Sequence, residues 1–157
     1  MYFRIAAESD LEELAQMRWD FRLEESPDTP VHDRQTFLEV CTVFLQRGLA
    51  SRRWVYWVAV CDGTLVSHVF VQRIDKVPKP NRLDDGLGYV TNVYTRPAYR
   101  GRGVGSELLA CVIEWAQVQD LECLLVGPSD TSVRFYERAG FHWNEDLMEY
   151  TLRPYVL

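Results

Sequence analysis

The chain has 157 residues, of which 47% are hydrophobic and 13% aromatic, and its formal net charge is −6. These values predict one folded domain over residues 1–157 and exclude a disordered chain. No apolar run has the length of a membrane span, and the N-terminus lacks the basic-then-apolar pattern of a leader. The acidic balance disfavours nucleic acid as a partner, so we expect a cytoplasmic protein that binds neither nucleic acid nor membrane.

The cysteines and histidines are scattered along the chain and form no Cys-x-x-Cys or other ligand spacing. We therefore expect reduced, buried thiols, with no metal site and no disulfide framework. The residues concerned are Cys41, Cys61, Cys111, Cys123, His32, His68 and His142.

In chain order, the first predicted elements are a short strand over residues 2–6 and a helix that runs to about residue 23. Ser9 is predicted to cap this helix, with Glu12 completing a capping box. The stripe that continues the helical period contains Leu11, Leu14, Ala15, Arg18 and Trp19. A break with two prolines over residues 26–30 ends the helix.

A second helix is predicted over residues 33–48, and it is followed by strands over residues 54–61 and 64–73. Asp62 and Gly63 between these strands are typical of a two-residue hairpin turn. The prolines and charged residues of 75–86 predict a loop. The central strand then covers residues 89–95.

The remaining elements alternate between helix and strand. We expect a helix over residues 106–119, a buried strand over 122–126 and a short helix over 131–139 that ends at Gly140. A final pair of strands is predicted over residues 141–143 and 147–152. The whole order is β-α-α-β-β-β-α-β-α-β-β.

Residues 96–106 join the central strand to the next helix, and they carry three glycines at alternate positions as well as three arginines. A helix start presents unpaired N–H groups and the positive end of the helix dipole. Glycines allow close approach to that backbone, so the segment predicts a phosphate site. An ordinary loop-to-helix transition is the alternative. The segment lacks the lysine of a P-loop and the spacing of a dinucleotide fingerprint.

Two blocks resemble the GNAT superfamily of N-acetyltransferases. Arg100, Gly103 and Gly105 match its Arg/Gln-x-x-Gly-x-Gly/Ala signature, with Pro97 and Tyr99 in the preceding positions. Residues 132–141 resemble the family's later helix, which carries a tyrosine and ends in Gly-Phe. The resemblance implies a mixed α/β (α+β) fold. This fold has a mostly antiparallel twisted sheet of about seven strands, four helices, and central parallel strands that splay apart.

The resemblance further implies that the chain binds acetyl-CoA and acetylates an amine. The pantetheine arm would lie between strands 92–95 and 124–126, and the amides of residues 101–106 would hold the diphosphate. Tyr136 occupies the position of the family's general acid. The implied cofactor-binding residues are Val93, Tyr94, Thr95, Arg100, Gly101, Arg102, Gly103, Val104, Gly105, Ser106 and Ser129.

Two positions depart from the family's pattern. Ser129 stands where many members carry an asparagine that contacts the cofactor, and Tyr89 stands where several carry a glutamate that acts as general base through water. The base is therefore left open among the carboxylates predicted to flank the site and Tyr89 acting through water. Those carboxylates are Glu24, Glu25, Asp84 and Asp85.

Residues 21–32 and the loop 75–86 are expected to bound the acceptor. The carboxylates of Asp20, Glu24, Glu25 and Asp28 suggest a cationic small-molecule amine. Analogy with relatives suggests a homodimer. The alternatives are a catalytically silent acyl-CoA-binding sensor and a nucleotide-binding α/β protein.

Overall fold

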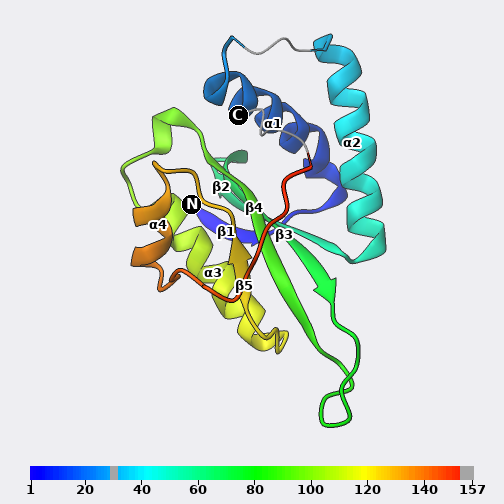
Figure 1. Ribbon diagram of the computed structural model, residues 1–157. Helices are drawn as coiled ribbons and strands as arrows, with labels where there is room; N and C mark the ends of the chain where they lie inside the picture. The colour runs from blue at the N-terminus through cyan, green and yellow to red at the C-terminus, as the bar shows by residue number, and fades with distance from the viewer. Residues whose placement is uncertain (29–31, 153–157) are drawn as a thin grey trace.

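The computed structural model describes residues 1–28 and 32–152 (Figure 1). Its centre is a sheet of five strands in the order β1-β2-β3-β4-β5. The first four strands pair antiparallel with their neighbours, whereas β5 runs parallel to β4. The strands are β1 (Tyr2–Ile5), β2 (Trp54–Cys61), β3 (Thr64–Asp75), β4 (Gly86–Thr95) and β5 (Leu124–Val126).

Four helices cover the two faces of this sheet. On one face α1 (Leu11–Glu25) and α2 (Arg34–Ser51) pack on a core that includes Leu14, Leu45 and Tyr56. On the other face α3 (Val104–Val118) and α4 (Val133–Arg138) pack on a core that includes Val90 and Leu108. The mixed α/β fold with four helices is therefore as predicted. No helix in the described part of the chain is long and apolar enough to cross a membrane.

The start of α1 differs from the prediction. A 3-10 turn over Glu8–Asp10 precedes the helix, and Ser9 does not cap it. Instead, the Asp10 carboxylate accepts the Ala7 N–H at 2.6 Å and a hydrogen bond from Arg4 at 2.6 Å. Asp10 follows Ser9 directly, and its charged carboxylate makes stronger hydrogen bonds than the Ser9 hydroxyl would.

The two hairpins follow the prediction. Asp62 and Gly63 both adopt left-handed φ values, 50° and 80°, as a two-residue turn with matching twist requires. The loop between β3 and β4 lies within the predicted residues 75–86. It projects away from α1 and α2, at the far end of the two longest strands (Figure 1).

The predicted final pair of strands, 141–143 and 147–152, is wrong, and with it the count of about seven strands. Residues 141–152 form no strand, and the side chains of Trp143, Met148 and Tyr150 are 70%, 99% and 87% exposed. Alternation marks a strand only where one face is buried, and after Phe141 no side chain of residues 142–152 packs on the core. The edge of β5 instead borders a pocket of about 330 Å³ that is lined in part by Leu124, Leu125 and Phe141.

Two smaller outcomes complete the comparison with the sequence. The cysteines are less buried than expected, because Cys123 is exposed and the other three are half-buried. Of the predicted break after α1, Thr29 and Pro30 lie outside the described residues.

Candidate active site

The pairing of β4 with β5 stops halfway along β4. Three pairs form the ladder, from Gly88 with Leu124 to Val90 with Val126. Residues 91–95 of β4 have no partner on β5 in the described part of the chain. The strands therefore diverge after Val90, and Leu124–Val126, which we expected to flank the opening, lie in the paired part.

A bulge at Asn92 redirects the unpaired half of β4. Asn92 has a left-handed φ of 49°, and the register of β4 against β3 shifts by one residue at this point. The Nδ1 atom of His68 lies 2.7 Å from the Asn92 carbonyl oxygen. Burial lowers the pKa of His68 to about 3, so the ring is neutral and its Nδ1–H donates to that carbonyl. The side chain of Asn92 is also held in place, because Arg18 Nη1 donates to Asn92 Oδ1 at 2.7 Å.

The segment after β4 forms an open turn at the start of α3. Gly101 and Gly103 have φ values of 70° and 81°, which only glycine adopts without strain. Among the residues that the structure describes, no side chain caps α3, so its first N–H groups bind no side-chain oxygen there. A Cβ atom on Gly105 would lie 3.3 Å from Thr95 Oγ1, which shows how closely the turn packs on β4. The turn has the geometry of an anion site.

The arginines beside the turn are already paired, which the sequence did not reveal. Arg96 contacts the carboxylates of Glu13 at 3.2 Å and Asp20 at 3.9 Å. Arg100 donates to both carboxylate oxygens of Glu24, at 2.5 and 2.9 Å. The Arg100 guanidinium holds the pKa of Glu24 below its usual value.

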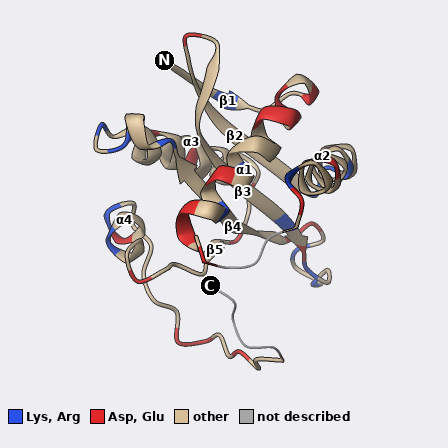
Figure 2. Cartoon of the chain, turned by 90° about the horizontal axis from the view of Figure 1, so that it is seen from above, with Lys and Arg blue, Asp and Glu red and all other residues tan. Residues whose placement is uncertain are grey.

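The positive charge of the turn is consequently mostly compensated. Arg102 is exposed and lies over the Tyr99 ring, with no carboxylate within 4 Å in the described part of the chain. Figure 2 shows the acidic stretches of α1, which supply the compensating carboxylates.

The three residues of β4 that are expected to bind the pantetheine arm, Val93, Tyr94 and Thr95, differ in whether their carbonyl groups already accept a hydrogen bond. The Tyr94 carbonyl accepts from Ser67 Oγ at 2.9 Å, and the Thr95 carbonyl accepts from Arg100 Nε at 2.8 Å. Val93 packs against the core beneath α3. Two of the three carbonyls therefore already accept one hydrogen bond each within the chain.

Tyr136 lies on α4 and is 7% exposed. Its ring packs against those of Phe135 and Phe141, at centroid distances of 5.0 and 5.5 Å. Burial, with a smaller effect of Tyr89, raises the pKa of Tyr136 to about 12. A Cβ atom on Gly127 would lie 3.7 Å from the Tyr89 hydroxyl, so Tyr89 reaches the end of β5.

Ser129 is exposed and takes part in a local network at the start of α4. Its hydroxyl lies 3.1 Å from Ser132 Oγ and 3.2 Å from Thr131 Oγ1, and its carbonyl accepts the Ser132 N–H at 2.8 Å. The residue therefore has a structural role whether or not it contacts a cofactor.

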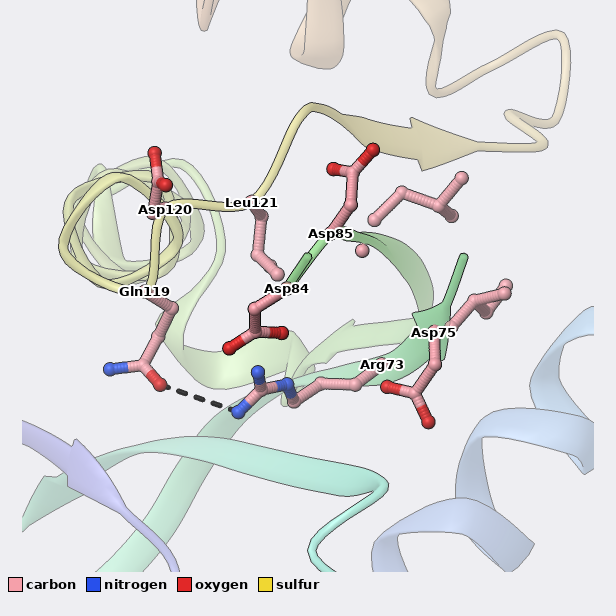
Figure 3. Close-up of a pocket in the computed structure, with 10 residues that line it drawn as sticks. Arg73, Asp75, Asp84, Asp85, Gln119, Asp120 and Leu121 are labelled. Carbon is pink, nitrogen blue, oxygen red and sulfur yellow. Dashed lines mark hydrogen bonds between the residues drawn. The ribbon is translucent and has the colours of Figure 1, made fainter. Parts of the chain in front are cut away.

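Asp84 and Asp85 lie at the opposite end of β4, so they cannot act as the base. Six or more residues of extended chain, about 20 Å, separate them from the unpaired half of the strand. Asp85 is buried, with Arg82 Nε at 3.1 Å and Lys79 Nζ at 3.3 Å. Both aspartates line a pocket of about 80 Å³ (Figure 3) that shares no residue with the turn. The loop 75–86 therefore does not bound the site.

Two further carboxylates that were considered as the base lie on α1. Glu24 binds Arg100, and Glu25 binds Arg22 at 2.6 Å. A carboxylate whose pKa is lowered, as that of Glu24 is, accepts a proton less readily.

Sequence reasoning missed the groups that shape the bulge, namely Arg18, His68 and Asn92. One signal existed, because Arg18 occupies a position on the otherwise apolar stripe of α1. The pair of Glu24 and Arg100 joins residues 76 positions apart, and no local pattern reveals such a contact.

Comparison with known proteins finds one family match and several similar folds. The model of the acetyltransferase (GNAT) family matches residues 11–141. A protein described as a predicted acetyltransferase with acetyl-CoA, from Clostridium acetobutylicum, has a similar fold, with a TM-score of 0.78 and 23% identity over 96% of each chain. A GCN5-related N-acetyltransferase from Ralstonia eutropha has a TM-score of 0.74 and 21% identity, over 96% of this chain and 97% of its own.

A curated relative is more similar in sequence over a shorter segment. It is the glucosamine 6-phosphate N-acetyltransferase of Trypanosoma brucei brucei, which is 31% identical over 75 residues. The match covers 48% of this chain and spans about half, 51%, of that relative's length.

Proposed function

The chain belongs to the acetyltransferase (GNAT) family, and we propose that it transfers the acetyl group of acetyl-CoA to the primary amine of a small molecule. One observation carries the proposal. The uncapped start of α3 adjoins the half of β4 that has left its partner strand. The first feature suits a diphosphate, and the second leaves backbone groups free for an extended ligand.

The residues present fit coenzyme A. The N–H groups of Gly101, Arg102, Gly103, Val104, Gly105 and Ser106 would hold the diphosphate, with the Arg102 guanidinium near it. The left-handed glycines keep side chains out of its path. The backbone of Val93, Tyr94 and Thr95 would bind the pantetheine arm as a neighbouring strand would. When bound, acetyl-CoA supplies an activated thioester.

Backbone N–H groups at Val93 or Tyr94 would stabilise the charge that develops on the thioester oxygen. One well-placed donor of this kind contributes about 3 kcal/mol to the transition state. The bulge at Asn92 sets the direction of these groups, so His68 and Arg18 act on the reaction by positioning the backbone.

Tyr136 would act on the leaving sulfur. Its pKa of about 12 exceeds that of an ordinary thiol, about 8.5, so complete transfer of its proton to the thiolate is unfavourable by about 5 kcal/mol. The hydroxyl therefore stays protonated and donates a hydrogen bond to the sulfur as negative charge develops there.

The ion pairs of α1 bear on the choice of acceptor. Asp20, Glu24 and Glu25 suggested a cationic amine, but each of them faces an arginine. That prediction therefore loses its support from α1. Glucosamine 6-phosphate, which the name of the trypanosomal relative gives as its substrate, belongs in any acceptor panel.

The test is thiol release from acetyl-CoA with a panel of cationic, neutral and anionic primary amines. Calorimetric binding of coenzyme A and ATP runs in parallel. Turnover with at least one amine, together with a clear preference for coenzyme A over ATP, supports the proposal. Tight binding of coenzyme A without turnover on any amine would identify a sensor. Equal affinity for ATP would identify a nucleotide-binding protein.

A further inference from the structure

Arg18 differs in its partners from most of the other half-buried arginines that the structure describes. Four of these arginines have a carboxylate within 4 Å, namely Arg4, Arg22, Arg82 and Arg96. Arg18 and Arg73 have none in the described part of the chain, and each donates to a side-chain amide instead. Arg73 lies beside the distant pocket of Figure 3, whereas Arg18 lies at the bulge of β4.

The surroundings of Arg18 make an uncompensated charge costly. It follows Met17, which is fully buried, and its guanidinium lies 5.5 Å from the centre of the Phe21 ring. Burial lowers the pKa of Arg18, with a further contribution from Arg22, and the opposing effects of Glu25 and Cys41 are smaller. Charges that are partly buried beside apolar side chains are ordinarily paired, because desolvation costs on the order of several kcal/mol per ion.

Holding the bulge does not require this charge. The amide of Asn92 accepts one hydrogen bond from Arg18, and a neutral donor could supply it without the cost of desolvation. A guanidinium has five N–H donors in a planar fork that matches a carboxylate or a phosphate. The described residues use one of the five.

We infer that Arg18 binds an anionic group, a carboxylate or a phosphate, that the amine acceptor carries. The inference rests on the proposed acetyl transfer and narrows its acceptor to amines with an acidic group. The alternative source of the anion is coenzyme A itself. Six residues of helix, about 9 Å, separate Arg18 from Glu24, which binds Arg100 beside the diphosphate turn. This separation assigns Arg18 to the acceptor.

The test uses matched pairs of acceptors that differ in the anionic group. Glucosamine 6-phosphate is compared with glucosamine, and β-alanine with β-alaninamide. We expect kcat/KM to favour the anionic member of at least one pair by about 10-fold or more, the usual effect of a charge-assisted hydrogen bond. The pair that shows the preference identifies the anion as phosphate or carboxylate.

Two substitutions and a control locate the effect. Arg18→Gln keeps a donor for Asn92 and should reduce the preference to less than about twofold, and Arg18→Lys should keep part of it. Arg73→Gln removes the other half-buried arginine that, in the described part of the chain, donates to a side-chain amide, and it should keep the full preference. Circular dichroism and thermal unfolding confirm that each variant is folded.

Several results would overturn the inference. One is equal use of both members of each pair by the wild type, and another is an equal loss on both members in Arg18→Gln. A higher KM for acetyl-CoA alone would assign Arg18 to the cofactor. If no amine is acetylated, the proposed function fails. Calorimetry in the presence of coenzyme A then decides separately whether Arg18 binds an anion. Binding of the anionic member by the wild type, and its loss in Arg18→Gln, would still support the anion site, and equal binding would refute it.

Discussion

The two ends of β4 contrast within a single ten-residue strand. At the Gly86 end the strand pairs with both neighbours, and the buried Asp85 beside it faces Lys76, Lys79 and Arg82. At the Thr95 end the strand has lost its β5 partner, bulges at Asn92 and leads into an uncapped helix. At the Gly86 end the charged side chains form ion pairs with one another. At the Thr95 end backbone groups of the described residues have neither a β5 partner nor a helix cap.

The contrast shows where a site is to be sought in this molecule. The pocket at the Gly86 end is lined by four aspartates, but a closed set of ion pairs beside it leaves little for a ligand to bind. The Thr95 end offers unpaired amides, which bind anions at helix starts. We therefore expect substitutions at the Thr95 end to change activity and those at the Gly86 end to change stability.

The largest expected effect is at Tyr136. Tyr136→Phe should lower kcat by about 10²–10³, the usual effect of removing one hydrogen-bond donor to charge that develops in the transition state, with little change in the KM for acetyl-CoA. Tyr56→Phe is the matched control, because Tyr56 is also buried and its hydroxyl bonds the Leu45 carbonyl. It should cost about 1 kcal/mol of stability and leave kcat unchanged. An unchanged kcat in Tyr136→Phe would show that Tyr136 serves only in packing.

The pH profile adds a test of the same residue. Because burial raises the pKa of Tyr136 to about 12, the hydroxyl keeps its proton well above the ordinary tyrosine value of about 10. The wild-type kcat should therefore show no loss from Tyr136 up to about pH 11. A loss centred near pH 10 that is absent in Tyr136→Phe would contradict this account.

The next effect is on binding at the turn. Gly103→Asp places a carboxylate where the diphosphate is expected, and should weaken coenzyme A binding at least about 100-fold by repulsion. Gly63→Asp is the control, since Gly63 has the same φ within one degree but lies in the β2–β3 hairpin. Both substitutions should cost about 1–2 kcal/mol of stability. Calorimetry that finds equal affinity in the two variants would move the diphosphate elsewhere.

At the other end of β4, Asp85→Asn should lower stability without changing kcat or KM. Burial opposes the charge of Asp85, but Lys79, Lys76 and Arg82 outweigh it and hold the carboxyl pKa below its usual value. The carboxylate therefore contributes stability above about pH 4, and this contribution is lost as the pH falls further. The urea midpoints of variant and wild type should converge in acid. A change in kcat instead would connect this end to catalysis.

The smallest expected effect concerns the ion pair that joins α1 to the turn. Glu24→Gln frees Arg100 for an anion, so coenzyme A should bind more tightly, by up to about fivefold for an exposed pair. Glu25→Gln breaks the neighbouring pair with Arg22 and should leave the affinity unchanged. Weaker binding in Glu24→Gln would mean that Glu24 holds Arg100 in place for the ligand.

Prediction from sequence succeeded where the signal is local. The β2–β3 turn at Asp62 and Gly63, the start of α2 near Asp33 and the start of α3 beside its glycines all follow from residues within a few positions. It failed where distant residues decide the outcome. The strands over 141–143 and 147–152 needed a core to pack on, and Arg18 reached its position only once α1 lay across β4.

The most direct test of the account is an NMR titration of the isotopically labelled protein with coenzyme A, which follows the backbone amide signals of its glycines. If the start of α3 holds the diphosphate, the signals of Gly101, Gly103 and Gly105 should shift at saturation, while that of Gly63 stays in place. Shifts confined to glycines at the hairpin end of β4, such as Gly86, would contradict the account, because they would put the ligand at the closed end of the strand.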